Sequence, residues 1–411
     1  MSSHLSPDIL HYENFDLRIH EQIDGQYPIE VIDSPVGEMA RPLLRPFHHL
    51  KVFNFMLDLA SLGRTDLKLR DARRLGKTLG QMLFPDQVWN MFYASLTQQS
   101  RRGQGLRIRL RIDPSELSRL PWEYCYREPF AYLSLSRETP LVRYINQPLA
   151  AHSLASTLPL RLLVVIASPF NLAPLDVESE KKRIIDALEG EEEQIQVQFL
   201  EQATVQRVQQ ALIQYRPHVL HFIGHGIVDQ KIGKLALEND ARKAHFVNAE
   251  QLMTLLQGRG IKIVVLNACQ TADFGKDDLA IMGIGPALVR ANIPAVIAMQ
   301  FPIPDSTAIL FTRQLYTSLA QGQALDTAIT EMRIAAYAQA NDKIHWGIPI
   351  LFMRSPDGII RQPRKEIEEP KQDPPKAKEQ PVSGINISDI SGGSNISINI
   401  GGDFAGGSIQ K

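Results

Sequence analysis

The sequence predicts an α/β fold with a mainly parallel sheet that is flanked by helices. From residue 160 onward, short apolar runs alternate with stretches in which apolar residues recur at helical spacing. Two of the runs, Val219–Ile223 and Ile263–Leu266, stop where polar residues begin, which is typical of a buried parallel strand whose carboxyl end opens onto a site. Short connections favour right-handed crossovers between such strands. We therefore expect a sheet that is covered on both faces.

The second half of the chain supplies these elements in order. The expected strands are Leu160–Ala167, Ile195–Leu200, Val219–Ile223, Ile261–Leu266 and Ala295–Met299. The expected helices lie near residues 176–189, 204–214, 248–257, 279–291 and 306–320. A helix near 324–340 and a strand near Ile348–Phe352 complete this part. We interpret residues 151–358 as one domain.

Residues 1–150 are expected to form an α+β subdomain. Strand patterns cover Tyr27–Ile32 and Leu106–Ile112, and two helices are predicted, one from Leu69 to Met82 and one from Pro85 through Leu96. The alternation of the second strand places its arginines on one face, namely Arg107, Arg109 and Arg111. We expect that face to be solvated, and an anion site is the alternative.

The composition is that of a soluble protein. The chain has 411 residues, 44% hydrophobic and 22% charged, which is enough to bury one large core or two smaller ones. Its net charge of -1 provides no field that would recruit nucleic acid. The chain contains two cysteines, Cys125 and Cys269, which argues against a disulfide scaffold and favours a reducing, cytoplasmic location. No apolar run approaches the ~20 residues of a membrane span.

The composition changes after Arg354. Residues 359–383 are rich in proline and charge, which predicts a disordered tether. Residues 384–411 alternate isoleucine with small polar residues, and Ile-Asn-Ile occurs at both 385–387 and 398–400. This is a strand pattern with no attached domain to receive it, so we expect either an assembly segment or a disordered tail.

Two residues at the predicted strand ends carry candidate chemistry. The run His221-Phe-Ile-Gly-His-Gly226 offers His225 as a general base, and Leu266-Asn-Ala-Cys269 offers a thiol nucleophile. The backbone N–H groups of Gly226 and Cys269 are candidates for an oxyanion hole. The structural alternative is that Cys269 is a small buried hydrophobe and His225 a hydrogen-bonded loop residue. Cys125 lies in an aromatic stretch and is expected to be structural.

Other site classes find less support. His218, His221 and His225 could suggest zinc, but a strand points His218 and His221 to opposite faces and no carboxylate completes the set. His221 is expected to be a hydrogen-bonded core histidine. The residues around Cys269 do not form a nucleophile elbow, and no phosphate-binding Gly-x-x-x-x-Gly-Lys-Ser/Thr loop occurs. Neither a metal nor a cofactor is expected.

The combined motifs resemble those of the CHAT domain, a caspase-like cysteine peptidase family of clan CD that is related to separase. The resemblance rests on His-x-x-Gly-His-Gly, Leu-Asn-Ala-Cys-Gln-Thr-Ala and Pro294-Ala-Val-Ile-Ala-Met-Gln-Phe-Pro-Ile-Pro-Asp305, with Leu120-Pro-Trp-Glu-Tyr upstream, and covers roughly residues 25 to 355. It implies a caspase-hemoglobinase fold, with His225 as base and Cys269 as nucleophile. It also implies that Gln300 and Asp305 contact substrate, where Asp305 would receive a basic P1 side chain. A helix cap is the alternative for Asp305.

The function implied by this resemblance is that of a cysteine endopeptidase acting on protein or peptide substrates, in a regulated prokaryotic defence or cell-death-like pathway. The alternative is an inactive caspase-like scaffold recruited through its tail. Ile398-Asn-Ile-Gly401 resembles the short amyloid signalling motifs of prokaryotic immune proteins. That similarity implies self-assembly through 384–411, or a partner protein that carries a matching motif.

Overall fold

A computed structural model describes residues 10–47, 69–148, 150–230, 232–270, 283–301, 303, 305–339 and 344–360. The side chains of Cys269 and Asp305 lie outside this description, as do the predicted tether beyond residue 360 and the whole segment 384–411. All described residues belong to one compact unit. None of its described helices is long and apolar enough to cross a membrane.

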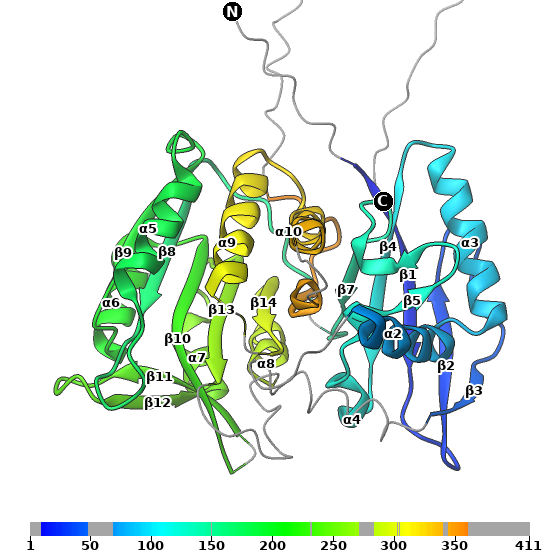
Figure 1. Ribbon diagram of the computed structural model, residues 1–411, viewed down its shortest axis with the longest axis horizontal. Coiled ribbons are helices and arrows are strands. Elements are labelled where there is room, and N and C mark those ends of the chain that lie inside the picture. The colour runs from blue at the N-terminus through cyan, green and yellow to red at the C-terminus, as the bar shows by residue number, and fades with distance from the viewer. Residues whose placement is uncertain are drawn as a thin grey trace, which may run out of the picture. The chain divides into compact units, whose positions relative to one another are not determined.

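The first half of the chain contributes seven strands and two long helices, among its described residues (Figure 1). Both helices and both strands predicted for this half are confirmed, and the remaining strands were not predicted. The strands are β1 (Tyr12–Ile19), β2 (Gln26–Asp33), β3 (Leu43–Pro46), β4 (Gly105–Ile112), the short β5 and β6 (Tyr126–Arg127 and Ala131–Tyr132) and β7 (Leu141–Arg143). The helical elements are α2 (Leu69–Leu83), α3 (Asp86–Ser100), α4 (Ser115–Ser118), η1 (Trp122–Tyr124) and η2 (Leu133–Leu135).

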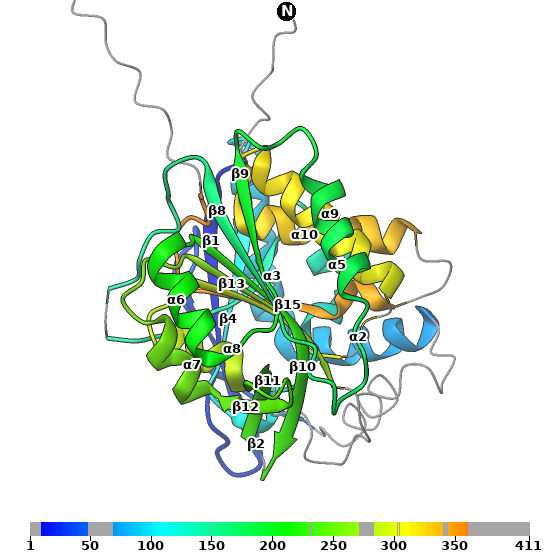
Figure 2. The ribbon, with the colours of Figure 1, turned by 90° about the vertical axis from the view of Figure 1, so that its left-hand side faces the viewer.

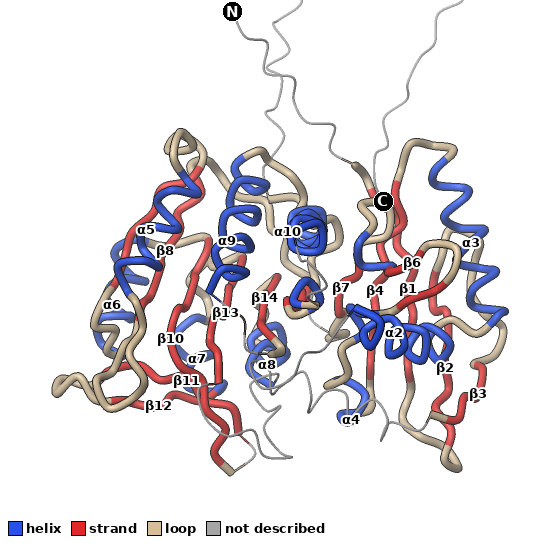
Figure 3. The backbone as a smooth tube through the Cα atoms, in the orientation of Figure 1, coloured by secondary structure: helices blue, strands red, loops and turns tan. Residues whose placement is uncertain are grey.

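The second half alternates strands and helices as the sequence predicts. Its strands are β8 (Leu160–Ile166), β9 (Ile195–Leu200), β10 (Val219–Asp229), β11 (Ile232–Glu238), β12 (Ala244–Asn248), β13 (Ile263–Gln270), β14 (Ala295–Met299) and β15 (Pro349–Met353). Its helices are α5 (Val177–Leu188), α6 (Val205–Tyr215), α7 (Ala249–Leu256), α8 (Ile284–Arg290), α9 (Asp305–Ala320), α10 (Leu325–Gln339) and the short η4 (His345–Gly347). The β11–β12 hairpin was not predicted, and Figure 3 shows it beside β10.

One mixed, mainly parallel sheet runs through both halves, which confirms the predicted fold class. Its order is β12-β11-β10-β13-β14-β15-β7-β4-β1-β2-β3, and β8 and β9 extend it from the first part of β10. The halves join where β15 pairs with β7. The predicted boundary at residue 150 falls in the connection between β7 and β8, and it stays an interpretation of the sequence.

Helices cover both faces of the second half. Figure 2 shows α5, α9 and α10 on one side of the strands and α6, α7 and α8 on the other. Side chains along β10 alternate between the two layers: Val219 and Ile223 join the first core, whereas Leu220 and Phe222 join the second. The parallel strands therefore read as continuous apolar runs because both of their faces are buried.

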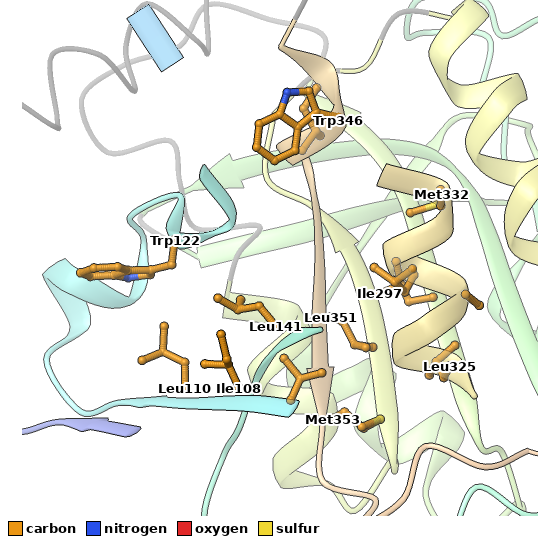
Figure 4. Packing of buried hydrophobic residues seen from close by; sticks show 14 of the residues in the cluster. Ile108, Leu110, Trp122, Leu141, Ile297, Leu325, Met332, Trp346, Leu351 and Met353 are labelled. Carbon is orange, nitrogen blue, oxygen red and sulfur yellow. The ribbon is translucent and has the colours of Figure 1, made fainter. Parts of the chain in front are cut away.

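The first of these cores continues into the amino-terminal half. Ile108 and Leu141 belong to the same buried cluster as Ile297, Met332 and Leu351, which Figure 4 shows in close-up. Helix α2 reaches this core closely because Gly76 and Gly80 have no side chains: a Cβ atom on either would lie 2.2 Å from a carbonyl oxygen of the 124–126 segment. The two halves are therefore held together by side-chain packing in addition to the backbone pairing of β15 with β7.

The arginine face of β4 differs from the sequence expectation of a solvated face. Arg107 is only 1% exposed, since it pairs with the buried Asp326 of α10 and donates to the carbonyl oxygens of Pro356 and Asp357 at 2.7 and 2.9 Å. Arg109 pairs with Asp16 on the adjacent strand β1. These partners come from distant parts of the chain, so strand periodicity alone could not identify them.

Candidate active site

His225 and Cys269 meet through strand register. Strands β10 and β13 are parallel neighbours, and their paired positions run from Val219 opposite Ile263 to Gly226 opposite Gln270. Within this register His225 is paired with Cys269. Two residues 44 positions apart in sequence thus become direct neighbours across two strands.

The environment of His225 differs in one respect from the strand-end position that the sequence predicts. Strand β10 continues to Asp229, so His225 lies within it. The reason is a change of partner: β10 pairs with β8 over Val219–Ile223 and then with β11 from Gly226 onward. The apolar run ends where β8 ends, while the backbone ladder continues.

The His225 ring is buried, with 1% of the residue exposed, and among the described residues it makes one hydrogen bond. Its Nε2 atom lies 2.7 Å from the carbonyl oxygen of Ala173. A carbonyl oxygen can only accept, so Nε2 carries the hydrogen and donates it. In the neutral ring Nδ1 then holds the lone pair, and it has no hydrogen-bond partner among the described residues. In this orientation Nδ1 is the ring atom that can accept a proton.

Ala173 is a hydrogen-bond partner of His225 that could not be identified from the sequence. It lies in the loop between β8 and α5, far from both motifs, and acts through its backbone oxygen. Every residue type has a backbone carbonyl, so the amino-acid sequence does not show which one makes this contact. The one local signal is Pro174, which restricts the preceding Ala173 to extended conformations.

His221 is confirmed as a hydrogen-bonded core histidine. Its Nδ1 atom lies 2.8 Å from the Tyr316 hydroxyl of α9, and burial lowers its pKa to about 3. The ring therefore stays neutral at physiological pH. It borders a cavity of about 10 Å³ together with Asn267 and Thr312, which is room for about one water molecule.

His218 and Cys125, the other two candidate side chains, are both placed as structural residues. The Nδ1 atom of His218 accepts a hydrogen bond from the backbone N–H of Arg161 at 3.2 Å, and burial lowers the pKa of this histidine to about 4. Burial raises the pKa of the Cys125 thiol, so this cysteine stays protonated and is confirmed as a core residue. Within the described ranges no group of three His, Cys, Asp or Glu side chains has the arrangement of a metal site.

Gln300 follows β14 at the carboxyl edge of the parallel strands and is buried. Its amide nitrogen donates to the Gly347 carbonyl oxygen at 2.7 Å and to Glu123 Oε2 at 3.1 Å. Glu123 also accepts two hydrogen bonds from Arg143, at 2.9 and 2.7 Å, so the three side chains form one buried network. The donors of Gln300 are therefore used inside the protein, and its role in substrate binding stays a prediction.

The remaining predicted site residues are placed by the backbone alone. Gly226 lies in β10 and is in register with Leu235 of β11 on one side and Gln270 of β13 on the other. Asp305 is the first residue of α9, the helix that follows β14 in the chain. The oxyanion role of Gly226 and both alternatives for Asp305 stay predictions.

Several solved structures are similar to this chain at low identity. The Saccharomyces cerevisiae separase-securin complex matches with a TM-score of 0.48 and 10% identity over 83% of this chain, which spans 30% of the separase chain. The Arg-specific cysteine proteinase gingipain R matches with a TM-score of 0.41 and 10% identity, covering 74% of this chain and 70% of that one. The Drosophila initiator caspase Dronc gives 0.34 and 9%, covering 50% and 84%.

A comparison with curated proteins found no match. The family comparison, in contrast, matched the CHAT domain over residues 73–376. This range is most of the chain, and it contains both motifs, the paired strands β10 and β13 and the loop that carries Ala173. The chain therefore belongs to the CHAT domain family.

Proposed function

We propose that this protein is a cysteine endopeptidase that cleaves protein substrates through a dyad of His225 and Cys269. The observation that carries the proposal is the register that pairs these two residues on adjacent strands. The hydrogen bond from Nε2 to the Ala173 carbonyl supports it, because it leaves Nδ1 free to accept a proton. Membership of the CHAT family supports the same class of reaction.

In the proposed reaction, His225 Nδ1 takes the thiol proton of Cys269, and the thiolate attacks the carbonyl carbon of the scissile bond. The Ala173 carbonyl stabilises the resulting imidazolium through Nε2. The N–H groups of Gly226 and Cys269 are the proposed donors to the oxyanion. The imidazolium then protonates the leaving amine, and water activated by His225 hydrolyses the acyl-enzyme to regenerate the thiol.

The experiment that tests this function is cleavage of an unstructured protein mixture by the purified full-length chain, compared with Cys269→Ala. Cleavage by the wild type alone supports the peptidase. Equal inactivity of both proteins would favour the non-enzymatic scaffold. A peptide library digested in parallel gives the side-chain preference on either side of the cut bond.

We propose further that Asp305, together with Gln300, contributes to binding of the P1 side chain. The support is their position after β14, the neighbour of β13, at the edge where β10 and β13 carry the dyad. A library should then show a preference for Arg or Lys at P1, and Asp305→Asn should weaken that preference because the carboxylate charge is lost. If Asp305 only caps α9, Asp305→Asn should leave P1 preference unchanged, and its cost should be limited to about 1 kcal/mol of stability or less.

For residues 384–411 we propose self-assembly that brings the peptidase to a partner with the same motif, in a prokaryotic defence or cell-death-like pathway. The support is the uncharged alternation Ile396-Ser-Ile-Asn-Ile400, which is free of proline. A synthetic 384–409 peptide should form fibres that bind thioflavin T, and Ile398→Asp should prevent them by placing a charge in every layer. Ile385→Asp, in the other Ile-Asn-Ile repeat, tests which repeat forms the stack. A wild-type peptide that stays monomeric even with preformed seeds would rule out assembly.

A further inference from the structure

The carbonyl that orients His225 sits on an exposed loop. Residues 168–176 connect β8 to α5, and Phe170, Ala173 and Pro174 are all exposed. An exposed connection is usually more mobile than the strands it joins. A fixed Ala173 carbonyl therefore requires ties from the loop to the rest of the fold.

The first of these ties is a buried carboxylate. Glu238, the last residue of β11, is only 2% exposed. Its Oε1 accepts a hydrogen bond from the backbone N–H of Ser168 at 3.0 Å, and its Oε2 lies 3.4 Å from Arg242 Nε. Its own backbone N–H donates to the Ala203 carbonyl at 2.9 Å, which fixes the residue that holds the loop. Because a buried carboxylate is costly without partners, the Ser168 contact strongly favours one loop position.

The turn of the β11–β12 hairpin holds the middle of the loop. The N–H of Phe170 donates to the Arg242 carbonyl at 3.1 Å. The Asn171 side-chain oxygen accepts from the N–H of Ala244, the first residue of β12, at 2.7 Å. Within the loop itself, the Ser168 hydroxyl accepts from Leu175 N–H at 3.4 Å. Ala173 lies between these ties, two residues beyond Asn171 and two before Leu175.

We propose that Glu238 and Asn171 are positioning residues for the base. Through Ser168 and Ala244 they hold the 168–176 loop in the conformation in which Ala173 accepts the Nε2 hydrogen of His225, and so they keep Nδ1 as the proton acceptor. The proposal rests on the proposed peptidase function. Neither residue touches the reacting atoms, and both act through the Ala173 carbonyl.

The experiment compares Glu238→Ala, Glu238→Gln and Asn171→Ala in the full chain, with Glu250→Ala as the matched control. Glu250 is an exposed glutamate in the first turn of α7, on the same half of the sheet. Steady-state kinetics on a cleavable peptide give kcat and KM, and ¹⁵N NMR of the histidine rings reports the tautomer of His225. His225→Gln identifies the His225 signals by their loss.

We expect Glu238→Ala to lower kcat roughly 100-fold with KM little changed, as a misplaced catalytic group does. Its His225 ring should lose the pure Nε2–H tautomer. Glu238→Gln keeps an oxygen for Ser168 N–H, so its loss should be much smaller. Asn171→Ala should act in the same direction as Glu238→Ala but less strongly, and because Asn171 is exposed, it decides the matter if Glu238→Ala does not fold.

Two outcomes would overturn the proposal separately from the function. If the wild type is active and both Glu238→Ala and Asn171→Ala keep its kcat and its His225 tautomer, the positioning role is wrong and the peptidase remains. If the wild type is inactive, the proposed function fails, and the positioning role is then judged from the His225 tautomer alone. A His225 tautomer that shifts in Glu238→Ala but not in Glu250→Ala would still support the positioning of the 168–176 loop by Glu238. An unchanged tautomer would reject it.

Discussion

Replacing Cys269 by Ala is expected to lower peptide-bond cleavage on the order of 10⁶-fold, because the nucleophile is removed and only background hydrolysis remains. His225→Gln should have a comparable effect. Its amide N–H can still donate to the Ala173 carbonyl, but the side chain cannot take the thiol proton. Since the two residues act as a unit, the double variant should be little slower than either single one. Initial rates with a fluorogenic peptide chosen from the library measure all three.

Cys125→Ala is the matched control for the nucleophile. Cys125 is fully buried and its pKa is raised by that burial, so its removal should leave turnover unchanged. Iodoacetamide followed by mass spectrometry should modify Cys269 and spare Cys125 for the same reason. Wild-type turnover by Cys269→Ala, or loss of turnover in a folded Cys125→Ala, would contradict the assignment of the nucleophile.

Glu123→Ala should destabilise the fold by about 3–5 kcal/mol, the cost of leaving a buried charge without its partner. Glu123 and Arg143 have side chains that are 0% and 4% exposed, and the carboxylate also accepts from Gln300. The carboxylate therefore connects the amino-terminal half to the end of β14. Urea unfolding followed by tryptophan fluorescence measures the change, and the buried Trp122 and Trp346 are suitable probes.

Glu331→Ala is the control for this experiment. Glu331 forms an ion pair with Arg137 at 2.9 Å, but Arg137 is half exposed, so the loss should stay within about 1 kcal/mol. Combining Glu123→Leu with Arg143→Met removes both charges and should recover most of the lost stability. A change of less than about 1 kcal/mol for Glu123→Ala would show that the buried network contributes little.

Periodicity was sufficient for the elements whose faces are buried. The helices α2 and α3 and the alternation from β8 to β15 were predicted because repeated apolar spacing reports directly on burial. The β11–β12 hairpin was not predicted: its outer strand β12 lies at the edge of the sheet, and Val247 is the one buried residue of that strand, so β12 has little apolar periodicity. The arginines of β4 were misread for a related reason. The alternation of arginines shows that they share one face of the strand, but it does not show that Asp16 and Asp326 pack against that face.

The sequence by itself was sufficient to identify the family, which the CHAT domain match confirms, and to predict His225 and Cys269 as the candidate dyad, since each stands in a motif of recognisable residue types. Only the tertiary structure decided the register that pairs them, the Ala173 carbonyl that orients the ring, and the Glu238 and Asn171 ties that hold its loop. These contacts use backbone groups or join residues far apart in sequence. Hydrogen bonds to the backbone can form at any residue type, so their location is set by how the strands pair and not by local composition.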